Sequence, residues 1–332
     1  MTRGALVESR HVVNACVVDA RGVVRAALGD VDVPVYIRSA AKPFITGAIV
    51  ASGAAERFAL EGKELAVIAA SHGGEPYHVA AVRGILEKIG LSVADLRCGA
   101  HPPAYEPAAA ALADAGEAPT AIHNNCSGKH AGILAMCVHL GHETAGYLEP
   151  AHPVQRSILA FCARMVDEDP AGLRLGVDGC GIPVFATPLR RAARAFARFA
   201  TLEGLADDDA LSLGVVRDAM VAHPRYVAGT GRLDTALMEA TGGRIVCKAG
   251  AEGVHGSALL RERLGVALKV VDGTRRAAAP AAIALLYRLG ALDTAEAEAL
   301  AAFGTPEVRN VAGRAVGRIQ VAPETIVTGG AS

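Results

Sequence analysis

Hydrophobic and polar positions near the start of the chain alternate as they do in a small β-structure that leads into a helix. Two runs rich in β-branched residues within 10–29 flank an Asp-Ala-Arg-Gly turn signal, which predicts a β-hairpin. The apolar stretch 33–37 predicts a further strand, and the weakly amphipathic segment 42–53 predicts a helix. The apolar run 63–70 is short, is followed by glycines, and is predicted to be another strand.

Through the middle of the chain, apolar residues recur with the period of a helix. The predicted helices cover 78–89, 107–115, 129–140, 153–167, 188–199, 209–221 and 232–240. Strand patterns return at 243–248, 266–271 and 315–321, with a helix near 278–289 between the last two. Strands at both ends predict an α/β (α+β) fold with one mixed sheet. We expect a single domain over 1–332, with a sheet lobe at about 1–75 and 240–332 and a helical lobe at about 76–239.

Composition narrows the class of protein. The 332 residues are 52% hydrophobic, which suffices for a sizeable core, yet no apolar run reaches the ~18 residues that span a bilayer. The net charge of −1, with both signs scattered, provides no electrostatic footprint for nucleic acid. Arg3, Glu8 and Arg10 interrupt any apolar signal segment, so we expect a cytoplasmic protein with neither membrane nor nucleic acid as partner. Seven cysteines, an odd number, argue against a disulfide framework and leave metal binding, catalysis or core packing.

Lysine is scarce, because the chain uses arginine as its ordinary cation. Only Lys42, Lys63, Lys88, Lys129, Lys248 and Lys269 stand among 33 basic residues. A lysine is needed where a guanidinium cannot serve, since only an amine can be neutral near pH 7. Lys42, Lys129 and Lys248 lie in glycine- and serine-rich, weakly charged surroundings, which makes them candidates for chemistry.

Ser39 and Lys42 form an S-x-x-K at the predicted helix start, where positions i and i+3 share a face. A neutral lysine can take the proton of a serine hydroxyl and so activate a nucleophile. The spacing alone is common by chance. A strand, a serine at a helix start and an apolar helix are nevertheless the arrangement of penicillin-binding enzymes and serine β-lactamases. Lys248-Ala249-Gly250 loosely matches their K-T-G, with Ala249 in place of the hydroxyl residue.

Ser71 directly follows the apolar run 63–70 and precedes two glycines. At the end of a strand, its hydroxyl would be displayed at the edge of a sheet. A capping serine in a turn explains the residue equally well.

Cysteine and lysine gather at the start of another predicted helix, in the segment HNNCSGKHAG at 123–132. The Gly-Lys pair resembles part of a P-loop, but the earlier glycine is missing and His130 stands where serine or threonine is required, which disfavours a nucleotide triphosphatase. Cys126 and Lys129 share a helix face and could share a ligand with Cys180. Two thiolates could hold zinc, yet this is no established zinc spacing, and buried cysteines in glycine turns explain the residues by themselves.

Taken together, these segments resemble the rhizobial-type (type 3) L-asparaginases. The matching segments, in family order from residue 38 to 254, are RSAAKPF, AASHGGE, HNNCSGKHAG, DGCGIP and CKAGAEGV. The resemblance implies a β-lactamase/glutaminase-like fold, a homodimer and hydrolysis of L-asparagine to L-aspartate and ammonia. It also implies two serine–lysine pairs and one zinc ion per chain. The implied pairs are Ser39 with Lys42 and Ser71 with Lys248, and the implied zinc ligands are Cys126, Lys129 and Cys180.

Amide hydrolysis needs a nucleophile and a base that later becomes the acid for the leaving ammonia. Ser39 is the first choice as nucleophile with Lys42 as its base, while Ser71 and Lys248 would relay protons. Exchange of the two serines' roles is left open.

The substrate is a small zwitterion, so its site needs a cation and an anion. Arg38 suits the α-carboxylate and Asp178 the α-ammonium, and His130 is a further substrate-binding candidate. Zinc held by two thiolates is nearly charge-neutral, and we expect it to orient the substrate rather than to generate hydroxide.

Two other classes of function stay open on sequence alone. One is another serine amidohydrolase, either a glutaminase or a penicillin-binding-type peptidase. The other is a non-catalytic, zinc-dependent amino-acid-binding protein, which the presence of both serine–lysine pairs disfavours.

Overall fold

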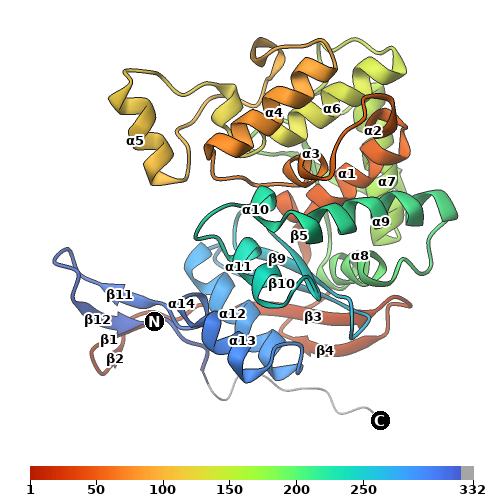
Figure 1. The fold of residues 1–332 in the computed structure, drawn as a ribbon. Helices are drawn as coiled ribbons and strands as arrows, with labels where there is room; N and C mark the ends of the chain where they lie inside the picture. The colour runs from red at the N-terminus through yellow and green to blue at the C-terminus, as the bar shows by residue number, and fades with distance from the viewer. Residues whose placement is uncertain (323–332) are drawn as a thin grey trace. The chain divides into compact units, whose positions relative to one another are not determined.

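The computed structural model describes residues 1–322 and divides the chain into two compact units (Figure 1). Unit 1 combines Met1–Ala40, Thr187–Thr201 and the chain from Ala236 onward. Unit 2 combines Ala41–Ala186 and Leu202–Thr235. One boundary falls within the S-x-x-K, so its serine belongs to unit 1 and its lysine to unit 2.

Unit 1 is built on a five-stranded antiparallel sheet in the order β4-β3-β10-β9-β8. Its strands are β3 (Val13–Asp19), β4 (Val24–Leu28), β8 (Ile245–Ala249), β9 (Val254–Leu259) and β10 (Leu264–Val270). The predicted N-terminal hairpin is confirmed, and Figure 1 shows its strands in the same sheet as those from the C-terminal part. The predicted α+β class is therefore correct, whereas the sheet is antiparallel throughout rather than mixed. Strand β9 was not predicted, because its sequence VHGSAL is buried throughout and shows no alternation of polar and apolar residues.

Helix α8 (Leu189–Thr201) packs closely on this sheet. Two strand glycines make the approach possible. A β-carbon on Gly256 would overlap the ring of Phe196, and one on Gly265 would lie 2.1 Å from both the Ala193 carbonyl oxygen and the Ala197 amide nitrogen. The backbones of α8 and β10 are therefore almost in contact. Helix α12 (Arg275–Arg288) also contacts β9 and β10.

Unit 2 is helical and forms around α1 (Lys42–Ala51), in which every residue from 42 to 49 is buried. Its other helices are α2 (Ala54–Arg57), α3 (Gly62–Ile68), α4 (Pro76–Lys88), α5 (Glu106–Asp114), α6 (Ser127–Leu140), α7 (Pro153–Val166), α9 (Asp207–Ala222) and α10 (Pro224–Val227). Helix α11 (Leu233–Ala240) spans the boundary between the units. Every helix predicted between 78 and 240 is present. The antiparallel ribbon of β6 (Arg174–Val177) and β7 (Pro183–Pro188) was not predicted.

The predicted strand at 63–70 is wrong, because this segment forms helix α3. Glu61 and Glu64 make a capping box, in which the Glu61 amide donates to Glu64 Oε2 at 2.6 Å and so begins the helix. A short apolar run that is buried on all sides shows no period that separates strand from helix. Ser71 consequently lies in a loop after a helix rather than at the edge of a sheet.

Shorter elements complete the described part of the chain. They are β1 (Thr2–Arg3), β2 (Leu6–Val7), β5 (Pro34–Tyr36), β11 (Glu307–Arg309), β12 (Ala315–Arg318), α13 (Thr294–Ala299), α14 (Ala301–Gly304) and the 3₁₀ turns η1 (Arg38–Ala41), η2 (Val93–Asp95), η3 (Ala121–His123) and η4 (Pro170–Gly172). β5 and β12 confirm the strands predicted at 33–37 and near 315–321.

Gly265→Ala should destabilise the protein strongly. The added methyl would meet backbone atoms of α8, which cannot move aside without separating the helix from the sheet. Overpacking of this kind costs ~1–3 kcal/mol or more. Urea unfolding of the purified variant measures the loss.

Gly172→Ala is the matched control, because no atom lies within 4 Å of the position that the added methyl would take and the backbone there is not left-handed. Its free energy of unfolding should stay within ~0.5 kcal/mol of wild type. A Gly265→Ala variant as stable as this control would show that α8 does not approach the sheet as closely as described.

Candidate active site

The side chain of Lys42 enters the interior of unit 2 at the first residue of α1. It is 1% exposed, and its Nζ lies 3.1 Å from Ser71 Oγ. The same nitrogen donates a hydrogen bond to the Ala70 carbonyl oxygen and contacts Cys126. Ser71 is itself buried, and its amide donates to the Val227 carbonyl at 3.0 Å. A serine hydroxyl and a lysine amine thus meet in a dry environment.

Burial lowers the pKa of Lys42, and the Lys129 amine nearby lowers it further, whereas the thiols of Cys126 and Cys180 oppose the change. The neutral amine has two N–H donors and one lone pair. The carbonyl of Ala70 and the sulfur of Cys126 can occupy the donors, which leaves the lone pair for the Ser71 hydroxyl. This is the arrangement that a general base requires.

The contact between Lys42 and Ser71 joins residues that the sequence analysis placed in different pairs. The S-x-x-K spacing suggested Ser39 as the partner, because only local helical neighbours can be inferred from spacing. The predicted pairs of Ser39 with Lys42 and Ser71 with Lys248 stay predictions, since each spans unit 1 and unit 2.

Within unit 1, the turn that contains Ser39 contacts the end of strand β8. A β-carbon on Gly250 would lie 3.1 Å from the Ile37 carbonyl oxygen and 3.3 Å from the Ala40 amide nitrogen, so the two backbone segments are in close contact. Lys248 precedes Gly250 by two residues, is fully buried, and donates from Nζ to the Ala249 carbonyl at 2.7 Å. The S-x-x-K serine and the lysine of the K-A-G segment therefore belong to adjoining backbone segments.

Arg38 has a left-handed backbone with φ of 52°, which is costly for a residue with a β-carbon. Backbone strain of this kind gathers at functional sites. The strained residue immediately precedes Ser39 in η1.

Cys126, Lys129 and Cys180 converge in unit 2. Cys126 immediately precedes α6, Lys129 lies in the first turn of that helix, and Cys180 lies in the turn between β6 and β7. Lys129 Nζ is 3.0 Å from Cys180 Sγ, and the two sulfurs are hydrogen-bonded to each other. The Cys180 hydrogen bond, helped by the charges of Lys129 and Lys42, holds the pKa of Cys126 well below its ordinary value. The same hydrogen bond, together with burial, raises the pKa of Cys180.

The neighbours of Lys129 favour its charged form. Burial alone would lower its pKa, but Cys126, Cys180 and the Asp178 carboxylate outweigh burial and raise it. Asp178 is half-buried and accepts from the Gly179 amide at 2.9 Å.

Two thiols and an amine that share hydrogen-bonding protons form a donor set suited to zinc, which prefers sulfur and nitrogen ligands. Metal binding would displace those protons. Over residues 1–322, no three histidine, cysteine, aspartate or glutamate side chains gather as a metal site. The proposed ligand set is of another kind, because its third member, Lys129, is a lysine.

His130 is fully buried in α6, and its Nδ1 lies 2.7 Å from the Tyr147 hydroxyl. Burial, together with the Lys129 and Lys42 charges, holds the pKa of His130 well below its ordinary value. The imidazole is therefore neutral at physiological pH.

His72 and Ser127, which no sequence pattern singled out, join the Ser71 loop to the start of α6. His72 Nε2 lies 2.9 Å from Ser127 Oγ, and the His72 amide donates to the Asn125 carbonyl at 3.2 Å. The Gly74 amide donates to His72 Nδ1 at 3.1 Å, so Nε2 carries the ring proton. The two residues lie in the segments AASHGGE and HNNCSGKHAG, but nothing in a sequence pattern pairs them.

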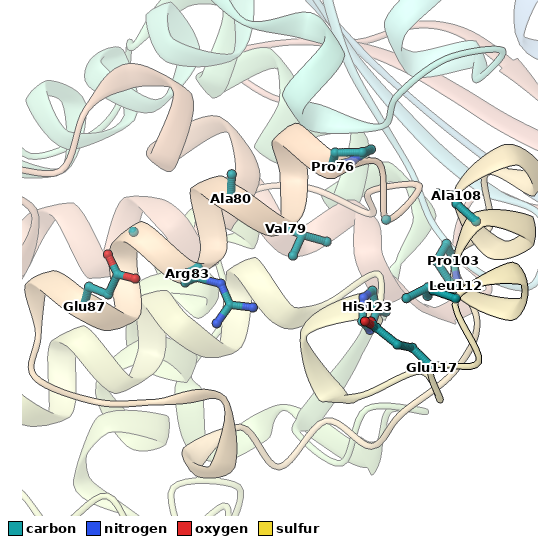
Figure 2. A pocket seen from close by; sticks show the side chains of 14 residues that line it. Pro76, Val79, Ala80, Arg83, Glu87, Pro103, Ala108, Leu112, Glu117 and His123 are labelled. Carbon is teal, nitrogen blue, oxygen red and sulfur yellow. The ribbon is translucent and has the colours of Figure 1, made fainter.

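A separate groove of about 500 Å³ lies between α4 and α5 (Figure 2). Its polar lining comes from Arg83, Glu87, Glu117 and His123. None of the ten predicted site residues lines this groove, so the lysine–serine centre and the groove are different places in unit 2.

A buried serine beside a buried amine is what a serine hydrolase of the lysine type requires. The model of the L-asparaginase II family matches residues 1–321, and the chain belongs to this family. It is thus an asparaginase-type amidohydrolase that acts on a small-molecule amide. The predicted L-asparaginase family is confirmed, whereas the type 3 assignment and the β-lactamase relationship stay predictions. No curated protein matches the chain. No helix in residues 1–322 has the length and apolar character needed to cross a membrane.

Cys126 should be alkylated as a thiolate in protein treated with a chelator. Cys126 and Cys98 are equally inaccessible, at 5% and 4% exposed, yet their pKa values move in opposite directions. Burial raises the pKa of Cys98 to about 11, whereas the Cys180 hydrogen bond lowers that of Cys126. Labelling with iodoacetamide, followed by peptide mass spectrometry, should find Cys126 modified first.

The pH dependence separates the two sites. The labelling rate at Cys126 should hardly change between pH 6.5 and 8.5, whereas an ordinary thiol gains about tenfold per unit below its pKa. Cys98 provides that reference within the same sample. A Cys126 rate that rises in parallel with that of Cys98 would mean that Cys126 is not held as a thiolate.

Proposed function

We propose that this chain is an L-asparaginase, which hydrolyses L-asparagine to L-aspartate and ammonia by serine–lysine catalysis. The observation that carries the proposal is the 3.1 Å contact between Lys42 Nζ and Ser71 Oγ at a buried amine. Membership of the L-asparaginase II family supports the choice of substrate. The contact favours Ser71 as nucleophile, which is the exchanged assignment of the two serines.

In the proposed reaction, Lys42 Nζ takes the Ser71 proton while Oγ attacks the side-chain amide carbon of asparagine. The tetrahedral intermediate then breaks its C–N bond, and Lys42 returns the proton to the departing nitrogen. Ammonia leaves, and an aspartyl ester remains on Ser71. Lys42 next takes a proton from water as the water oxygen attacks the ester, and returns that proton to Ser71 as L-aspartate is released.

The other proposed catalytic residues are Ser39 and Lys248. In unit 1, Gly250, two residues after Lys248, lies against the turn that contains Ser39, and this backbone contact supports a role as a second proton-carrying pair. Arg38 and Asp178 are proposed to receive the α-carboxylate and the α-ammonium of the substrate.

We also propose one zinc ion per chain, held by Cys126, Lys129 and Cys180. The mutual hydrogen bonds of these three side chains support the assignment. The ion would orient the substrate and stiffen the site, since two thiolates leave it nearly neutral. A homodimer and a cytoplasmic location complete the proposal; sedimentation and cell fractionation test them.

Lys42→Arg should abolish ammonia release from asparagine, with a loss of about 10³-fold or more in kcat, because a guanidinium cannot accept the serine proton at working pH. Lys63→Arg is the control: Lys63 pairs with Glu61 at 2.8 Å on the surface, where only charge matters. That variant should keep wild-type turnover within about twofold.

Ser71→Ala should lose as much turnover as Lys42→Arg, and the double variant should lose no more, because the two residues act as one unit. Turnover above about a tenth of wild type in either single variant, a barrier change under ~1.4 kcal/mol, would contradict the assignment. The nucleophile would then be sought at Ser39.

Parallel assays with glutamine separate an asparaginase from a glutaminase, and asparagine binding without turnover would indicate a binding protein.

The zinc content of the protein should depend on each of the proposed ligands. Cys126→Ser and Cys180→Ser should each lose the metal, whereas Cys162→Ser, a fully buried cysteine in α7, should keep about one zinc per chain. Elemental analysis of the purified proteins measures this. Zinc retained in Cys180→Ser would remove that residue from the ligand set.

A further inference from the structure

His130 has an imidazole nitrogen with no partner. Its ring is fully buried, and Nε2 has no hydrogen-bond partner among residues 1–322. Leaving a buried polar atom unpaired is unfavourable, so such an atom in a folded protein needs an explanation. His130 directly follows Lys129 in the first turn of α6, which places it beside the candidate active site.

The other nitrogen of His130 determines which proton the ring carries. Nδ1 lies 2.7 Å from the Tyr147 hydroxyl, and this hydroxyl accepts from the Arg97 amide at 2.9 Å. Burial raises the pKa of Tyr147, so the phenol keeps its single proton. Among the described atoms, His130 Nδ1 is the acceptor available to that proton. The phenol therefore donates to Nδ1, and the neutral ring has its proton on Nε2.

Tyr147 is held firmly enough to perform this task. It is fully buried, its ring meets that of His130 edge-on at 79° and 5.6 Å, and its carbonyl accepts from Gln155 Nε2 at 2.7 Å. The hydrogen bond from the Arg97 amide also holds the hydroxyl in place. The phenol oxygen has little freedom to turn away from the histidine.

We infer that Tyr147 is a positioning residue that holds His130 as a neutral Nε2–H donor for a carboxylate or amide oxygen of the substrate. A protonated nitrogen has no lone pair, so His130 in this state is not a metal ligand. A neutral donor suits the site, which already contains the amines of Lys42 and Lys129. The ligand half of this inference rests on the proposed function, whereas the tautomer does not.

Nitrogen-15 NMR of the histidine rings tests the tautomer without any ligand. Wild-type protein should show His130 as a single Nε2–H form, and Tyr147→Phe, which keeps the ring and removes the hydroxyl, should show a mixture of both forms. Tyr77→Phe is the control, because Tyr77 donates to Glu75 at 3.0 Å and is also partly buried. It should leave the His130 signals unchanged. An Nδ1–H form in wild type would overturn the inference.

Calorimetric binding of L-aspartate tests the ligand half without turnover. Tyr147→Phe should weaken binding about tenfold, as for a lost hydrogen bond to a charged group. His130→Gln, whose amide can present an N–H where Nε2 stood, should bind within about threefold of wild type, whereas His130→Asn, which imitates Nδ1, should bind at least about tenfold more weakly.

The outcomes remain distinguishable. Equal affinities in His130→Asn and His130→Gln, or unchanged binding in Tyr147→Phe, would overturn the donor role even if asparagine is hydrolysed. Absence of ammonia release from asparagine with the expected NMR result would overturn the proposed function and leave the tautomer standing. Melting temperatures identify a variant that fails to fold, and the tautomer in wild type then still decides.

Discussion

Charge compensation among two amines and two thiols inside unit 2 is the interaction on which the candidate site depends. Lys42 and Lys129 are almost completely buried, as are Cys126 and Cys180. An isolated ammonium in such a place would carry a penalty of several kcal/mol. Each amine is instead hydrogen-bonded to a sulfur, Lys129 to Cys180 and Lys42 to Cys126. With one thiolate and one ammonium already paired, the second amine is free to be neutral. The base character of Lys42 is thus a property of the whole cluster.

Close backbone contact fixes the distances within this cluster. A β-carbon on Gly128 would lie 2.1 Å from the Val67 carbonyl oxygen, so the start of α6 rests directly on the end of α3. The bonds of His72 to Ser127 and Asn125 join the same two places. Because α3 leads to Ser71 and Cys126 immediately precedes α6, one contact between helices positions both the serine and the thiol. Glycine at 128 is required by this proximity, since any larger residue would separate the helices.

The scarcity of lysine was the most informative feature of the composition. Lys42, Lys129 and Lys248, which were selected because arginine replaces lysine elsewhere, are the lysines that the structure buries to 1% exposure or less. The others have ordinary roles: Lys63 and Lys88 pair with glutamates, and Lys269 donates to backbone carbonyls. The selection worked because burial of a cation without a functional reason is costly, so an amine retained in weakly charged surroundings indicates its chemistry.

Local periodicity by itself determined most helices, the N-terminal hairpin and the proximity of Cys126 to Lys129, because these depend on neighbours within one or two turns. It failed for α3, because a segment that is buried on every side shows no helical period in its apolar residues. For Lys42 it could suggest only a local partner, Ser39. Tertiary packing alone decided that Lys42 meets Ser71, 29 residues away, and that His130 meets Tyr147, 17 residues away. Such contacts follow from how helices rest on one another through glycines and small side chains. Residue spacing does not encode that packing, because many helix pairings satisfy the same apolar pattern and only the folded core selects one.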